Sequence, residues 1–169
     1  MSKAIEEQML NRAKALLADK TVTKVAGWKK GLFGYDVTPG IFTSEAQLDS
    51  EFIYNQYCGA NLSKYMVKEN ANIETNKATV KTNNQMALQR DPNAAQAPIP
   101  QEKVLVFLKP CDTYSFNQLL SEHRIEKEKF YVVGVGCNGH LDMNKVYAQG
   151  VEGILSMSED ENNLIVETV

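Results

Sequence analysis

The stretch VLVFLKPCD, residues 104–112, decides the fold of this 169-residue chain. Its five apolar residues in a row predict a buried strand, which ends at the turn-forming residues Lys-Pro-Cys-Asp. A second apolar run at residues 130–136 leads into the motif Cys-Asn-Gly-His at 137–140, and residues 113–124 between the runs have a helical pattern. A right-handed crossover through that helix predicts that the strands over 103–108 and 130–136 form a parallel pair.

Both motifs therefore follow strands at the same edge of the predicted sheet. Open parallel sheets bind ligands at the carboxyl ends of their strands, so this edge is the candidate site. Its candidate cofactor-binding residues are Cys111, Asp112, Cys137, Gly139 and His140. Gly139 permits a positive φ, which would bring the backbone close to a ligand.

The cysteine and histidine candidates each have two interpretations. Cys111 is either a redox thiol, cluster ligand or cofactor contact at a helix N-terminus, or a small buried residue beside Asp112 as helix cap. His140 is either a metal ligand or proton donor, or a surface histidine without a task. Cys58 is a third candidate thiol, or a core cysteine beside Gly59, whose backbone freedom loosens or ends a helix there.

The remaining pattern predicts an α/β fold of two or three layers, with a mixed, partly parallel sheet, in a single domain over residues 1–169. The expected elements are a helix at 3–18, strands at 21–28 and 35–42, a helical stretch from Ser44 to Met66 that contains Cys58, and a C-terminal hairpin at 153–157 and 164–168.

Residues 71–100 differ in composition from the rest of the chain. They are rich in asparagine, glutamine and proline and poor in large apolar residues. Such a segment buries too little apolar surface to offset the entropy of ordering. It predicts a flexible insertion, with a short strand at residues 78–81.

Composition excludes several classes of protein. A net charge of −3 without a basic patch argues against nucleic-acid binding, and apolar runs of about five residues argue against a membrane span. A charged N-terminus without an apolar segment predicts a cytoplasmic protein. Three cysteines without a CxxC pair are too few for a disulfide framework or for a four-thiolate iron–sulfur site within the chain.

The two cysteine motifs, in their order along the chain, resemble those of a known protein family. Lys-Pro-Cys-Asp at 109–112 and VVGVGCNGHLD at 132–142, with YCGANLSKY at 57–65, resemble the coenzyme F(420)-type hydrogenase/dehydrogenase beta-subunit family over residues 52–169. The resemblance implies a redox module of an electron-transfer oxidoreductase subunit, in a hydrogenase, formate dehydrogenase or heterodisulfide-reductase-like complex of anaerobes. It implies electron transfer through a 4Fe-4S cluster or a flavin (FAD).

The same resemblance implies partners. Family members usually join this module to a ferredoxin-like segment, expected beyond Val169, where a strand pattern still continues; the expected partners are that segment, redox subunits or a second copy of the chain. Three thiolates, Cys58, Cys111 and Cys137, could hold a cluster if His140, a substrate or another subunit gave the fourth ligand. The alternative is a non-catalytic α/β docking or binding domain that retains the scaffold.

Overall fold

A computed structural model of the chain describes residues 3–33, 35–159 and 163–169. Its main sheet has four strands in the order β2-β1-β3-β4: β1 (Lys24–Lys30), β2 (Val37–Phe42), β3 (Val104–Leu108) and β4 (Phe130–Gly134). β1 pairs with β2 antiparallel, whereas β1–β3 and β3–β4 are parallel. The sheet is therefore mixed and partly parallel, as the sequence predicts.

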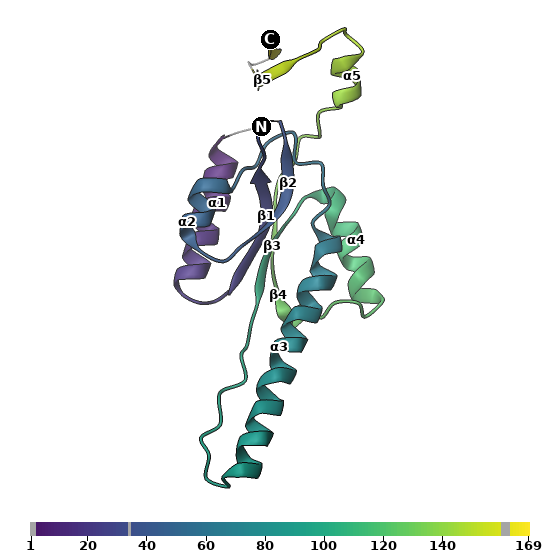
Figure 1. The fold of residues 1–169 in the computed structure, drawn as a ribbon. Helices are drawn as coiled ribbons and strands as arrows, with labels where there is room; N and C mark the ends of the chain where they lie inside the picture. The colour runs from purple at the N-terminus through teal and green to yellow at the C-terminus, as the bar shows by residue number, and fades with distance from the viewer. Residues whose placement is uncertain (1–2, 34, 160–162) are drawn as a thin grey trace.

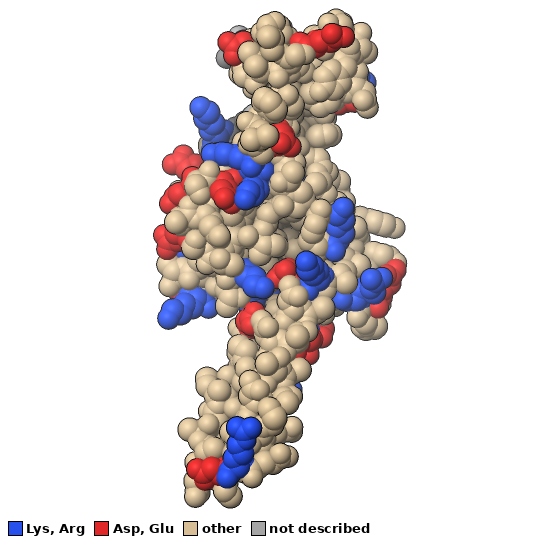
Figure 2. Space-filling model, in the orientation of Figure 1, with Lys and Arg blue, Asp and Glu red and all other residues tan. Residues whose placement is uncertain are grey.

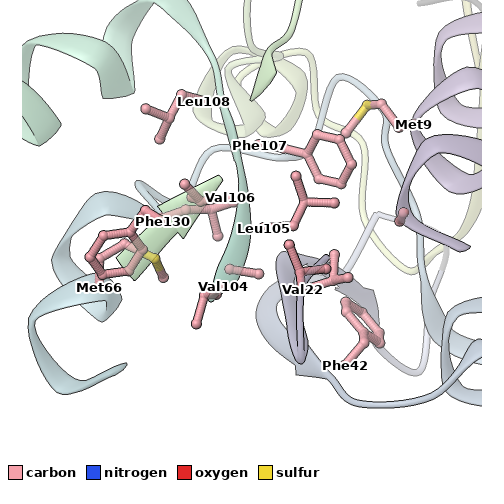
Figure 3. Close-up of a cluster of buried hydrophobic side chains, with 14 of the residues drawn as sticks. Met9, Val22, Phe42, Met66, Val104, Leu105, Val106, Phe107, Leu108 and Phe130 are labelled. Carbon is pink, nitrogen blue, oxygen red and sulfur yellow. The ribbon is translucent and has the colours of Figure 1, made fainter. Parts of the chain in front are cut away.

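Helices cover both faces of this sheet, which gives three layers (Figure 1). One face carries α1 (Lys3–Ala18) and α2 (Glu45–Glu51), and the other carries α3 (Ser63–Arg90) and α4 (Pro110–Ser121). All five residues of β3 are buried. Because side chains alternate along a strand, Leu105 and Phe107 lie toward Met9 of α1, and Val106 lies toward Met66 of α3 (Figure 3).

The predicted strand–helix–strand unit is confirmed. β3 and β4 are parallel in the register Val104↔Phe130 to Leu108↔Gly134, and α4 connects them. The helix begins at Pro110, three residues earlier than expected. Proline suits the first turn because its fixed φ is helical and its missing N–H has no partner to lose there.

The predicted strand at residues 78–81 is wrong, because α3 runs through it for 28 residues. Met66 and Ile73 anchor the first half of this helix, whose buried residues end at Ile73. Beyond that point the helix projects from the body, and residues 91–103 return beside it (Figure 1). We call residues 74–103 the arm. Most of its visible surface is uncharged (Figure 2); its mobility stays a prediction.

The predicted helical stretch from Ser44 to Met66, loosened or ended at Gly59, is wrong around Cys58. α2 ends at Glu51, and residues 52–62 form an irregular connection to α3. Phe52 is extended and forms an isolated antiparallel bridge with Lys29, and the Ile53 N–H donates to the Trp28 carbonyl at 3.0 Å. Pairing with β1 thus ends the helix at Glu51, eight positions before Gly59.

The C-terminal part follows β4 as a short helix, α5 (Met143–Tyr147), and a hairpin of β5 (Ile154–Glu159) and β6 (Leu164–Thr168). The hairpin is antiparallel, as predicted, with a register shift between Ile154 and Ser156. It forms a second sheet apart from the first. In the part of the chain that the structure describes, no helix has the length and apolar character needed to cross a membrane.

Candidate functional site

Three loops meet at the carboxyl ends of β3 and β4 and enclose a pocket of about 370 Å³. The loops are residues 52–62 before α3, the β3–α4 junction, and residues 135–142 after β4. We call this space the three-loop pocket. Ten residues line it: Asn55, Gln56, Cys58, Gly59, Lys109, Pro110, Cys111, Cys137, Gly139 and His140.

All three cysteines therefore contribute to one site, although Cys58 lies 53 positions before Cys111 in the sequence. Gly139, with a φ of +120°, and His140 also line the pocket. Asp112, the remaining candidate, is not among the lining residues. It is 1% exposed.

The pocket wall contains a buried charged pair that connects two of the loops. Lys109 is 3% exposed, and its Nζ donates to the carbonyl oxygens of Cys58 and, at 3.2 Å, of Ala60. The same ammonium lies 3.7 Å from Asp112 Oδ2 and 4.7 Å from the centre of the Trp28 ring. Lys109 thus attaches the segment that contains Cys58 to the start of α4.

Asp112 stabilises the start of α4 at the same time. The Lys109 backbone N–H donates to Asp112 Oδ2 at 3.4 Å, in the manner of an acidic residue in the first turn of a helix. Burial raises the pKa of the Asp112 carboxyl, and the Lys109 ammonium opposes this shift. Lys109 was not predicted as a site residue; the available signal was a lysine directly between an apolar strand and a proline.

Hydrogen bonds to backbone carbonyls connect the remaining loops. Tyr54 Oη donates to the Gly136 carbonyl at 2.9 Å, and Trp28 Nε1 donates to the Ala60 carbonyl at 3.2 Å. Burial raises the pKa of the Tyr54 phenol, which keeps the hydroxyl protonated as a donor. These residues lie far apart in the sequence, so spacing alone gives no signal for them.

His140 is fixed by the loop that it faces. Its Nδ1 lies 2.9 Å from the Gln56 carbonyl, which also accepts the Leu141 N–H at 3.0 Å. A carbonyl oxygen only accepts, so Nδ1 carries the proton and Nε2 of the neutral ring is an acceptor. A Cβ at Gly59 would lie 2.8 Å from His140 Cε1, so this contact requires glycine.

The three thiols have different environments. Cys58 is 4% exposed, and its Sγ accepts the Asn55 N–H at 3.3 Å. Burial raises the pKa of this thiol to about 12, which keeps it neutral. Cys111 is exposed, and Cys137 is half-buried with its Sγ 3.7 Å from the Gly139 carbonyl. Cys111 and Cys137 are therefore the more accessible thiols.

The described side chains are not gathered as the ligands of an iron–sulfur cluster. Among the described residues, no group of three or more Cys, His, Asp or Glu side chains is gathered to hold a metal ion. The neutral Cys58 thiol, already hydrogen-bonded, is a poor source of the thiolate that a cluster requires. The predicted metal role of Cys58, Cys111 and Cys137 stays a prediction.

A small organic ligand such as a flavin fits the pocket better. The volume lies in the range of roughly 300–1,000 Å³ that is typical of small-molecule sites. The lining residues that the structure describes include two side-chain amides and one ammonium, and none is a carboxylate. Such groups match the carbonyl and N–H edges of a heterocyclic ring.

Comparison of the sequence with models of protein families and with curated proteins finds no match. The function is therefore inferred from the geometry of the three-loop pocket and from the resemblance of its cysteine motifs.

Proposed function

We propose that this chain is the redox module of an electron-transfer oxidoreductase subunit, and that the three-loop pocket holds a flavin. The observation that carries the proposal is the convergence of all three cysteines on one pocket at the carboxyl ends of two parallel strands. That position is where open α/β sheets bind their ligands. A redox role is also what the resemblance of the cysteine motifs implies.

The lining residues have distinct tasks in this proposal. The amides of Asn55 and Gln56 provide polar contacts to the ring edge, Lys109 supplies a positive charge in the wall, and the thiols and Pro110 give a less polar surface. When bound, the flavin supplies the capacity to accept and release electrons. The protein orients it, excludes water on the buried side, and leaves Cys111 and Cys137 on the accessible side.

Electron flow through such a module begins and ends outside the chain. One redox partner reduces the bound group and a second partner, such as a ferredoxin-like segment, takes the same electrons away. The expected setting is the cytoplasm. The pocket opening beside Cys111 and Cys137 is the place where such a partner would approach.

The direct test is flavin binding by the full chain. We expect protein purified without oxygen to be yellow, or to bind added FAD with quenching of the flavin fluorescence. Cys111→Trp places a large ring in the pocket and should weaken FAD binding at least tenfold. Tyr114→Trp adds the same ring on α4 at a residue that is 82% exposed and outside the pocket, and it should leave binding unchanged.

Two results would contradict the proposal. A folded chain that binds neither FAD nor FMN would favour the non-catalytic docking domain instead. Brown protein whose iron content falls in each of Cys58→Ser, Cys111→Ser and Cys137→Ser would show that an iron–sulfur cluster, and not a flavin, occupies the pocket. In both cases circular dichroism of the variants establishes that they are folded.

A further inference from the structure

Lys109 differs from Lys129, the other buried lysine among the described residues, in how its charge is balanced. Lys129 is 2% exposed and lies 2.7 Å from both Glu74 and Glu126, so two carboxylates neutralise it. Lys109 stands 3.7 Å from Asp112, beyond ordinary hydrogen-bond distance, and donates instead to two neutral carbonyl oxygens. Lys109 is therefore balanced by one carboxylate at 3.7 Å, against two at 2.7 Å for Lys129, so its charge acts more strongly on its surroundings.

Those surroundings include the three-loop pocket. Lys109 lines the pocket, together with Pro110 and Cys111 from the first turn of α4. The N-terminus of a helix has a partial positive charge, which adds to that of the ammonium. Asp112 is not a lining residue and is 1% exposed. The lining of the pocket thus carries a positive charge and no carboxylate, and the compensating carboxylate is buried outside the lining.

We propose that Lys109 sets the reduction potential of the group in the pocket by stabilising the form that has gained negative charge, and that Asp112 limits this effect. This inference rests on the proposed function. Two-electron reduction of a flavin with uptake of one proton adds one negative charge to the ring, and a nearby cation favours that form. A desolvated wall strengthens the interaction, because water no longer screens it.

Substitutions of Lys109 and Asp112 should shift the reduction potential in opposite directions. Removing the Lys109 charge should weaken binding of the reduced flavin relative to the oxidised form. Removing the Asp112 charge should strengthen it. Both side chains are buried and lie 3.7 Å apart, so a merely structural disturbance would act in the same direction in the two variants.

The experiment measures the midpoint potential of FAD bound to the full chain, with dithionite as reductant and a reference dye. We expect Lys109→Met to lower the ratio of reduced to oxidised affinity by about tenfold, as for charges ~10 Å apart at an effective dielectric constant of ~20. For a two-electron couple this is a shift of about 30 mV to lower potential. Asp112→Asn should shift the potential upward, and Lys109→Arg should restore it.

Lys77→Met on the arm is the control and should leave the potential unchanged. Shifts of the same sign in Lys109→Met and Asp112→Asn, or no shift in either, would overturn the inference while FAD binding still supports the proposed function. If Lys109→Met does not fold, Asp112→Asn decides alone, since asparagine keeps the acceptor for the Lys109 N–H. Failure of the unaltered chain to bind FAD would overturn both proposals together.

Discussion

Polar residues lie at both ends of the main sheet, but their contacts differ between the two ends. At the carboxyl end of β3, Gln56 and Lys109 contact groups from other loops, and these contacts shape the three-loop pocket. At the other end, the arm makes its polar contacts mostly within itself, as between Asn84 and Ala97. Polar residues form a site where several elements converge on them, and their number alone says little about function.

The pocket end and the arm also differ in how far their side chains are buried, and therefore in how much each contributes to stability. Around the pocket, buried side chains from β1, β3 and α4 share one core. In α3, the buried residues are Ser63, Met66, Glu69 and Ile73, all in the first eleven positions of the helix. We therefore expect substitutions to be costly at the pocket end and nearly neutral in the arm.

The largest effect is expected for Phe107→Ala in β3. Phe107 is fully buried and packs against Phe52 with ring centres 6.0 Å apart. Truncation of a buried phenylalanine costs about 3–5 kcal/mol of unfolding free energy. Urea denaturation should show this loss, whereas Tyr114→Ala at an exposed site should change stability by no more than about 0.5 kcal/mol. Similar costs for the two variants would contradict the assigned core.

Two substitutions within α3 test where the buried part of the helix ends and the arm begins. Ile73 is fully buried, and Ile73→Ala should cost about 2–5 kcal/mol. Met86 lies thirteen positions later on the same helix and is 45% exposed, so Met86→Ala should change stability by about 0.5 kcal/mol or less. Equal losses of unfolding free energy in urea denaturation would mean that the arm packs against another part of the chain along its whole length.

The pH dependence of stability tests the environment of Cys58. Folding raises the pKa of this thiol from 9.0 to about 12, so in this interval the folded chain keeps a proton that the unfolded chain loses. The contribution is complete below pH 9 and is lost as pH rises, by up to ~1.4 kcal/mol per unit. Urea denaturation between about pH 8 and pH 10 should show this slope reduced in Cys58→Ala but kept in Cys111→Ala. An equal slope in Cys58→Ala would place Cys58 in contact with water.

The central part of the fold could be predicted because its signals are local. Apolar runs at 104–108 and 130–134 and the helix between them are enough to specify the parallel pair. The convergence of Cys111 and Cys137 on one pocket follows from that topology. Cys58 reaches the same pocket from a loop and not from a helix, because pairing of Phe52 with β1 is a tertiary contact that a local pattern does not contain.

The helix in the arm escaped prediction for a related reason. Asparagine and threonine have modest helix propensity, and Thr79-Val80 locally resembles a strand. The buried anchors at Met66 and Ile73 fix the start of α3, and once a helix is nucleated each further residue adds a hydrogen bond. Lys109 of the pocket wall and Trp28 beside it were missed because their hydrogen bonds join segments about fifty and thirty positions apart.

The smallest expected effect belongs to Asn84→Ala in the arm. The Asn84 side chain accepts the Ala97 N–H at 2.9 Å and donates to the Ala97 carbonyl at 2.8 Å, which connects α3 to the returning segment. Hydrogen bonds of this kind contribute about 0.5–1.5 kcal/mol each, here to closure of the arm and not to the core. Hydrogen exchange should become about tenfold faster at residues 91–100, with urea denaturation nearly unchanged. A matching loss of global stability would show that the arm folds as one unit with the sheet, and strong protection across residues 71–100 of the unaltered chain would contradict the predicted mobility.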